Sequence, residues 1–230
     1  MKNKNNYKKS LYIVISVLIL ALSVCYVDAV IKPNYLIKSI VKIIFYLVIP
    51  MTYFIINKDE FASFKSMFYP NKKNFIKSIL LGILIYILIL LGYFLLKNII
   101  DFTNVTTNLT DNMGITIDNL LYVTIYIAFL NSFLEEFFYR GYAFITLKKH
   151  TNRKFAYIFS ASLFAFYHVG MLLESFHFPD IILIVLGLFF GGCLFNFLNE
   201  KSNNLYPSWI VHMFTNFAIN TVGFILFTFI

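Results

Sequence analysis

Charged side chains are scarce in this sequence of 230 residues: Asp, Glu, Lys and Arg together make up 13%, whereas 60% of the residues are hydrophobic. A soluble domain of this length cannot bury so much apolar surface. Only two cysteines are present, Cys25 and Cys193, and both fall in apolar stretches, which excludes a disulfide framework and a thiolate metal site. We therefore interpret the chain as an integral membrane protein whose first partner is the lipid bilayer.

The formal net charge of +8 does not indicate a nucleic-acid partner. The positive residues lie in short segments between the apolar stretches, where they set the orientation of a membrane protein instead of forming a basic face. We expect no nucleic-acid binding.

Seven stretches are long and apolar enough to cross a hydrocarbon core of about 30 Å, which needs roughly 20 helical residues. The sequence therefore predicts an all-α fold, a polytopic membrane bundle of about seven transmembrane helices in one membrane domain over residues 1–230. Lys38, Lys42 and Pro50 make the second span the weakest, and the first shows no small-x-small signal-peptide cleavage site, so we expect it to be uncleaved. The spans are expected near 11–31, 36–56, 76–97, 119–146, 155–173, 180–199 and 206–229.

Loop charges alternate in sign along the chain, as they do when Lys and Arg are kept on the cytoplasmic side. This alternation predicts that the N-terminus is inside. An abundance of Lys, Asn, Ile, Phe and Tyr is typical of bacteria with AT-rich genomes, so we expect the cytoplasmic membrane of a bacterium. The positive residues are Lys2, Lys4, Lys8 and Lys9 before the first span, Lys58, Lys65, Lys72 and Lys73 after the second, and Lys148, Lys149, Arg153 and Lys154 after the fourth, whereas the alternate loops hold Asp101, Asp111, Asp118, Glu174 and Asp180.

The fourth span carries charges in its interior, within the stretch NSFLEEFFYRGYAF at residues 131–144. An ionisable side chain inside a span costs at least about 2.5 kcal/mol, so each one indicates a functional site until a partner is found. Glu136 and Arg140 are four residues apart with the acid first, the favourable order for a helical ion pair. Glu135 points about 100° away and has no such local partner.

Two later spans also carry polar side chains. His168 follows Phe164 by four residues in the fifth span, and His212 precedes Asn216 by four in the last, so each pair shares a helix face. At about 1.5 Å per residue, Glu135, His168, His212 and Asn216 lie roughly 16 to 22 Å from the Lys-bearing ends of their helices. All four can therefore meet at one depth. In contrast, Gly187 and Gly191 form a small-xxx-small pair that predicts helix packing.

These pieces resemble a known pattern. Glu-Glu-x-x-x-Arg-Gly at 135–141, Phe-x-x-x-His at 164–168 and His-x-x-x-Asn at 212–216 are similar, in order and spacing, to the three motifs of the CAAX protease and bacteriocin-processing (CPBP, Abi) family of intramembrane endopeptidases. The resemblance covers roughly residues 125–225, the expected catalytic core. It implies that Glu135, His168, His212 and Asn216 form the active site, with Glu136 and Arg140 in support.

Peptide hydrolysis needs an activated water, a site for the oxyanion and a proton for the leaving amine. In one hypothesis Glu135 takes a proton from a water oriented by His168, while His212 and Asn216 donate to the oxyanion. In the other, Glu135, His168 and His212 bind a divalent metal such as zinc, as the family's usual description as metalloproteases implies. That reading would need Glu136 as the base, although it pairs with Arg140. We favour the first, and the sequence leaves both open.

Two other functions compete with proteolysis. Intramembrane Glu, His and Asn also mark ion-coupled transporters, but no inverted repeat is visible. A catalytically inactive immunity or scaffold protein would have no reason to keep these buried charges. The expected partner is a peptide or protein substrate: prenylated CAAX ends, secreted peptides under maturation and bacteriocin leaders or self-immunity all remain open.

Overall fold

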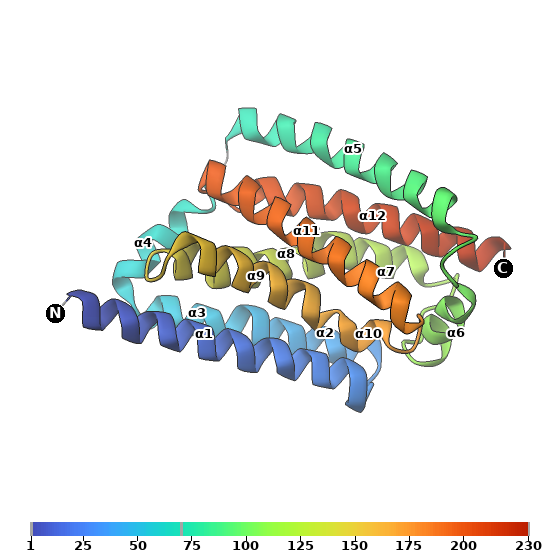
Figure 1. The fold of residues 1–230 in the computed structure, drawn as a ribbon, viewed down its shortest axis with the longest axis horizontal. Helices are drawn as coiled ribbons and strands as arrows, with labels where there is room; N and C mark the ends of the chain where they lie inside the picture. Colours follow the sequence, from blue (N-terminus) through green and yellow to red (C-terminus); the bar gives the residue numbers. More distant parts are fainter. Residues whose placement is uncertain (1, 70, 230) are drawn as a thin grey trace.

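The computed structural model describes residues 2–69 and 71–229, and over these residues every regular element is a helix (Figure 1). Seven helical stretches are long and apolar enough to cross a membrane by length and composition, which confirms the predicted all-α bundle. The chain is thus an integral membrane protein. The spans are Asn5–Ile31, Tyr35–Ile56, Lys72–Leu96, Leu120–Thr146, Arg153–Leu172, Phe178–Ser202 and Tyr206–Thr228.

Several spans change from α-helical to π-helical geometry along their length; the π-helical segments are labelled η. In chain order the elements are α1 (Lys2–Tyr26), η1 (Val27–Ile31), α2 (Tyr35–Ile43), η2 (Ile44–Val48), α3 (Ile49–Ile56), α4 (Lys58–Ser66), α5 (Lys72–Leu96), α6 (Thr103–Asp111), α7 (Leu120–Tyr126), η3 (Ile127–Asn131), α8 (Ser132–Glu135), η4 (Glu136–Thr146), α9 (Arg153–Tyr167), α10 (Val169–Leu172), α11 (Phe178–Ser202) and α12 (Tyr206–Phe229).

Asparagine side chains mark several helix boundaries. The side chains of Asn34, Asn71 and Asn152 accept hydrogen bonds from backbone N–H groups in the first turns of α2, α5 and α9. This is the capping role for which Asn is favoured, because the first N–H groups of a helix have no partner within it. Lys32 and Asn203 adopt left-handed backbone angles, with φ of 48° and 49°, and turn the chain between consecutive spans.

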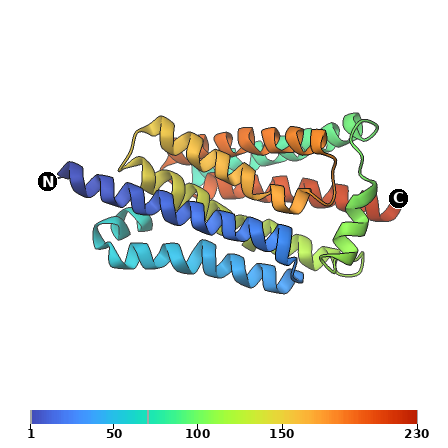
Figure 2. The ribbon, with the colours of Figure 1, turned by 60° about the horizontal axis from the view of Figure 1, so that its bottom comes forward.

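The fourth span forms the centre of the bundle. All residues of η4 are buried, and α9, α11, α1 and η2 pack around it. Figure 2 shows α1 lying beside the second span along one face, where the rings of Tyr12 and Tyr53 stack with centroids 5.7 Å apart. On the opposite face α5 packs mainly against α12 (Figure 1), with Gly82 directly against Phe214. The charges of the fourth span are therefore shielded from lipid by protein.

One prediction about helix packing is wrong. Beside Gly187 and Gly191 there is open space, with no neighbouring atom within 4 Å of an added Cβ. The close contact comes from Gly192, where an added Cβ would lie 3.2 Å from the Cα of Ala161 and 3.3 Å from the ring of Phe164. Because α11 and α9 meet on this side, the packing glycine is one residue beyond the predicted pair.

Short helices cover the two ends of the bundle. Helix α4 lies at the end that carries the N-terminus, and α6 lies at the other (Figure 1). The carboxylate of Glu60 on α4 is buried and bonds three basic groups: His150 Nε2 at 2.8 Å, Lys149 Nζ at 3.0 Å and Lys9 Nζ at 3.4 Å. Burial alone would raise the pKa of Glu60, but the bond from Lys149 and the nearby charges hold it below its ordinary value. This cluster ties α1, α4 and the loop after the fourth span together.

Candidate active site

The fourth span is irregular on both sides of Glu135. Residues 132–135 form a single α-helical turn between the π-helical segments η3 and η4. Such segments are rare and are frequent at functional sites. The last span packs against η3: Asn216 Nδ2 donates to the Ile127 carbonyl at 3.2 Å, and Trp209 Nε1 donates to the Phe129 carbonyl at 3.1 Å. The backbone around Glu135 is therefore held by side chains of α12.

Three side chains hold the carboxylate of Glu135, which is 2% exposed. Asn131 Nδ2 donates to Oε1 at 2.6 Å, and the Lys42 ammonium lies 3.6 Å from the same oxygen. His212 Nε2 lies 3.6 Å from Oε2. Lys42 also donates to Asn131 Oδ1 at 3.2 Å, so the cation, the amide and the carboxylate form one cluster. Glu135 thus has the ionic partner that its position on the fourth span does not provide.

Behind Glu135, the charged groups continue into the core. The Nδ1 atom of His212 lies 2.9 Å from Glu136 Oε1, and the Nε atom of Arg140 lies 3.5 Å from Glu136 Oε2, as the i,i+4 spacing predicts. The guanidinium of Arg140 is fully buried and lies 4.0 Å and 5.0 Å from the ring centroids of Phe164 and Phe195. Aromatic faces attract a desolvated cation, so the two rings and Glu136 together hold this charge.

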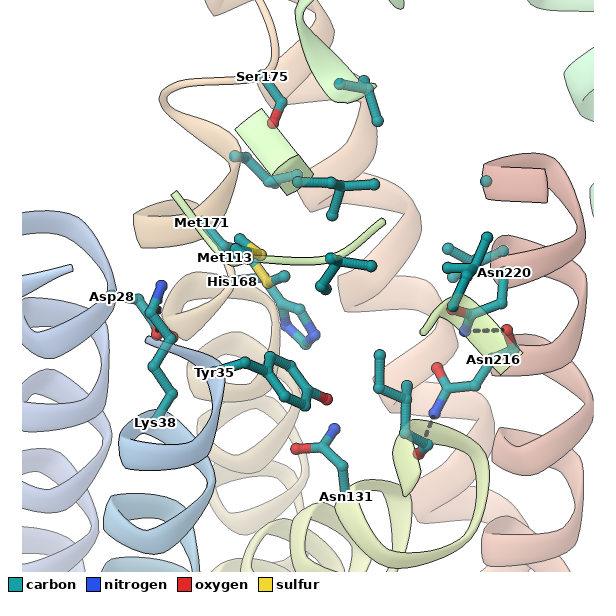
Figure 3. Close-up of a pocket in the computed structure, with 18 of the residues that line it drawn as sticks. Asp28, Tyr35, Lys38, Met113, Asn131, His168, Met171, Ser175, Asn216 and Asn220 are labelled. Carbon is teal, nitrogen blue, oxygen red and sulfur yellow. Dashed lines mark hydrogen bonds and ion pairs between the residues drawn. The ribbon is translucent and has the colours of Figure 1, made fainter. Parts of the chain in front are cut away.

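A cavity of about 330 Å³ lies beside Glu135 and reaches the end of the bundle that carries α6. Glu135, His168 and Asn216 all line it, whereas His212 is set back behind Glu135. Figure 3 shows His168, Tyr35 and Asn131 around its middle and Asn216 on the opposite wall. The structure therefore brings the four sequence-predicted residues together: three line the cavity, and the fourth, His212, contacts Glu135.

His168 and Asn216, the other two predicted residues that line the cavity, have defined orientations. His168 Nδ1 lies 2.7 Å from the Phe164 carbonyl, and since a carbonyl only accepts, Nδ1 carries the proton and Nε2 is left for the cavity. The amide of Asn216 has two N–H donors, of which one is used by the Ile127 carbonyl. Asn220 Nδ2 donates to the backbone carbonyl of Asn216, so this bond does not occupy the Asn216 side chain, which faces the cavity (Figure 3).

The predicted zinc ligands do not fit a three-ligand metal centre. Among the described residues no group of three or more His, Cys, Asp or Glu side chains is placed to hold a metal ion. The ammonium of Lys42, 3.6 Å from Glu135, already places a positive charge beside the carboxylate that would have to bind the metal. Two of the three predicted ligands, Glu135 and His212, do face each other, but His168 does not complete the set.

Sequence reasoning missed several residues of this site. In the sequence Lys42 weakened the prediction of the second span as a membrane helix, although a charge inside a span is itself a signal of function. Asn131 is four residues before Glu135, the spacing at which two side chains on a helix meet. Tyr35 and Tyr167 line the cavity too, but aromatic residues are so frequent here that nothing in the sequence singles them out.

Comparison with known proteins supports the resemblance. Residues 117–218 match the model of the Rce1-like family, described as type II CAAX prenyl endopeptidase Rce1-like. No curated protein and no solved structure gives a match. The matched segment runs from the start of the fourth span into the last one and contains Glu135, His168, His212 and Asn216, but not Lys42.

Proposed function

We propose that this chain, whose residues 117–218 match the model of the Rce1-like family of CAAX proteases, is an intramembrane endopeptidase that hydrolyses a peptide bond of a membrane-associated or secreted peptide. One observation carries the proposal: a carboxylate buried within the bundle, Glu135, lines a cavity together with His168 and Asn216. A structural ion pair alone needs no cavity beside it.

Glu135 acts as the general base in this proposal. The carboxylate takes a proton from a water in the cavity, the hydroxide attacks the substrate carbonyl, and the proton is returned to the leaving nitrogen. The lone pair of His168 Nε2 faces the cavity and orients the water. Lys42 keeps Glu135 ionised, since a cation 3.6 Å away offsets the cost of burying a carboxylate.

Asn216 supplies a donor to the oxyanion through the N–H that Ile127 does not use. We assign His212 a positioning role instead of the oxyanion role expected from the sequence, because its ring lies between Glu135 and Glu136 and is set back from the cavity. Glu136, which pairs with Arg140, fixes the His212 ring. Glu136 and Arg140 therefore act on Glu135 through His212. No step in this scheme passes through a metal.

The test compares membrane and secreted peptides from cells that carry the wild type, Glu135→Gln or Glu200→Gln. Glu200 is the matched control: it is a carboxylate paired with Lys148 and Arg153 at the far end of α11, outside the site. We expect product peptides with the wild type and with Glu200→Gln, and none with Glu135→Gln, although all three accumulate in the membrane. Product formation by Glu135→Gln at the wild-type level would refute the assignment of the base.

A further inference from the structure

The two ends of the bundle carry opposite charge. The end with α4 is rich in Lys and Arg, whereas acidic side chains dominate the end with α6. One of the few cations at the α6 end, Lys32, is paired with Glu174. Because Lys and Arg are kept in cytoplasmic loops, the α4 end lies inside and the α6 end outside. The first group comprises Lys58, Lys65, Lys72, Lys73, Lys148, Lys149, Arg153, Lys154 and Lys201, and the second Asp101, Asp111, Asp118, Glu174 and Asp180.

The cavity extends from the α6 end of the bundle to Glu135. Its lining comes from α6 and the residues on either side of it, from η1 and α2, from the fourth span between Leu120 and Glu135, from the end of α9, α10 and the residues that follow it, and from the second half of α12. Met171 and Ile219 line it and are 36% and 53% exposed, so the cavity reaches the surface of the protein. Glu135 is the lining residue farthest along the fourth span from its start at Leu120, about 22 Å by helical rise.

Packed protein separates Glu135 from the opposite end. The eleven residues of η4, which run from Glu136 to Thr146, are all buried, among them Phe137, Phe138 and Tyr139. At the helical rise these residues span roughly 16 Å. The cavity therefore gives water and a peptide chain a path to Glu135 from the α6 end, whereas the residues that follow Glu135 toward the α4 end are packed in the core.

Helix α6 lies across the open end of the cavity and is fixed there by polar contacts. Asn108 Nδ2 donates to the Ser175 hydroxyl at 2.6 Å, and Asn112 Nδ2 donates to Glu174 at 2.9 Å. The side chains that α6 turns toward the cavity are apolar: Val105 and Leu109, with Phe102 just before the helix. Taken as a whole the cavity wall is mostly apolar, which suits a substrate with apolar side chains next to the scissile bond.

We propose that the substrate reaches Glu135 from the non-cytoplasmic face, past α6, and is therefore an exported peptide or an extracytoplasmic segment with apolar residues at the cleavage point. Cytosolic prenylated CAAX ends are then not substrates of this chain, although the family description names that class. The cleavage itself rests on the proposed function, whereas the direction of access does not.

The experiment measures cysteine labelling by a small, membrane-impermeant trimethylammonium thiosulfonate in a parent with Cys25→Ala and Cys193→Ala. Asn104→Cys and Ala62→Cys report which end is outside, since both positions are exposed, on α6 and α4 respectively. Ser39→Cys reports the cavity. Ser78→Cys is its matched control: both serines are buried and bond the carbonyl four residues earlier, but only Ser39 lines the cavity.

In intact cells we expect labelling of Asn104→Cys and Ser39→Cys but not of Ala62→Cys or Ser78→Cys, and in inside-out vesicles the label should reach Ala62→Cys alone. Labelling of Ala62→Cys in intact cells overturns the orientation, and equal labelling of Ser39→Cys and Ser78→Cys overturns access through the cavity. Each result is independent of catalysis. If the labelling is as expected but Glu135→Gln forms the same products as the wild type, the proposed function fails and the direction of access stands.

Discussion

Removal of the Lys42 ammonium tests how Glu135 is kept ionised. Lys42→Met keeps the length of the side chain and removes the charge 3.6 Å from Glu135 Oε1. At that distance, with an effective dielectric constant of about 20, the attraction is about 4–5 kcal/mol. Loss of one partner from a buried pair typically costs about 3–5 kcal/mol, because the other charge stays buried without compensation.

A loss of about 3 kcal/mol of carboxylate stabilisation shifts the balance between ionised and protonated Glu135 roughly 100-fold toward the protonated form, since each 1.36 kcal/mol is a factor of ten. Protonated Glu135 cannot take a proton from water, so we expect kcat/KM of Lys42→Met to fall by up to about 100-fold. The assay follows the product peptide, identified from the wild type and Glu135→Gln, in proteoliposomes. Lys42→Arg should recover much of the rate because it restores a cation beside Glu135.

The matched control is Lys38→Met, one turn earlier on the same helix. Lys38 is buried to a similar extent and pairs with Asp28 at 3.5 Å, so its loss costs stability in the same way, but it does not contact Glu135. Thermal unfolding midpoints should fall by similar amounts in the two variants, whereas only Lys42→Met should lose most of its activity. Equal activities of Lys42→Met and Lys38→Met, or a loss below threefold in the former, would refute the reasoning.

Two further predictions concern stability. Lys9, Lys149 and His150 face the Glu60 carboxylate, and its pKa in the folded protein is held below the ordinary value. The ionised carboxylate therefore stabilises the folded protein at any pH above its pKa in the unfolded chain, and this stabilisation is lost as the pH falls through its pKa in the folded protein. Glu60→Gln should therefore lower the thermal unfolding midpoint at pH 7, measured in detergent, and this effect should shrink as the pH falls below the ordinary Glu pKa of about 4.3; a pH-independent difference would contradict this. Gly192→Val should destabilise the protein by about 1–3 kcal/mol through overpacking against Ala161. Gly191→Val, which meets open space, should stay within about 0.5 kcal/mol, and equal unfolding midpoints would show that α9 and α11 do not pack closely here.

The seven spans could be predicted because the length of an apolar run is a local property of the sequence. The third span illustrates this, because its apolar run can be recognised without knowing which helix it packs against. The helix found at Lys72–Leu96 starts only a few residues before the predicted range. The asparagine caps act at the same short range. Helix packing is different, since nothing local shows which face of α11 meets α9, and the choice of Gly187 and Gly191 over Gly192 was wrong.

The candidate site divides in the same way. The Glu136–Arg140 pair follows from a four-residue spacing, and the level of His168 follows from counting residues from a loop. The contact of Lys42 with Glu135 joins residues 93 positions apart, so no spacing rule finds it. The direction of the His212 ring depends on Glu136, a partner from another span, and the π-helical turns around Glu135 leave no compositional mark.

The positions of the charges suggest why the N-terminal spans are needed for the site. Each acid buried within a span has a cation within 3.6 Å: Asp28 has Lys38, Glu135 has Lys42 and Glu136 has Arg140. An unpaired ion in an apolar interior is too costly to persist, so these pairs must form together as the helices pack. The family match begins at residue 117 and contains Glu135 without its cation. A fragment limited to residues 117–218 would bury that carboxylate unpaired, and we infer that the second span is part of the catalytic unit because it carries Lys42.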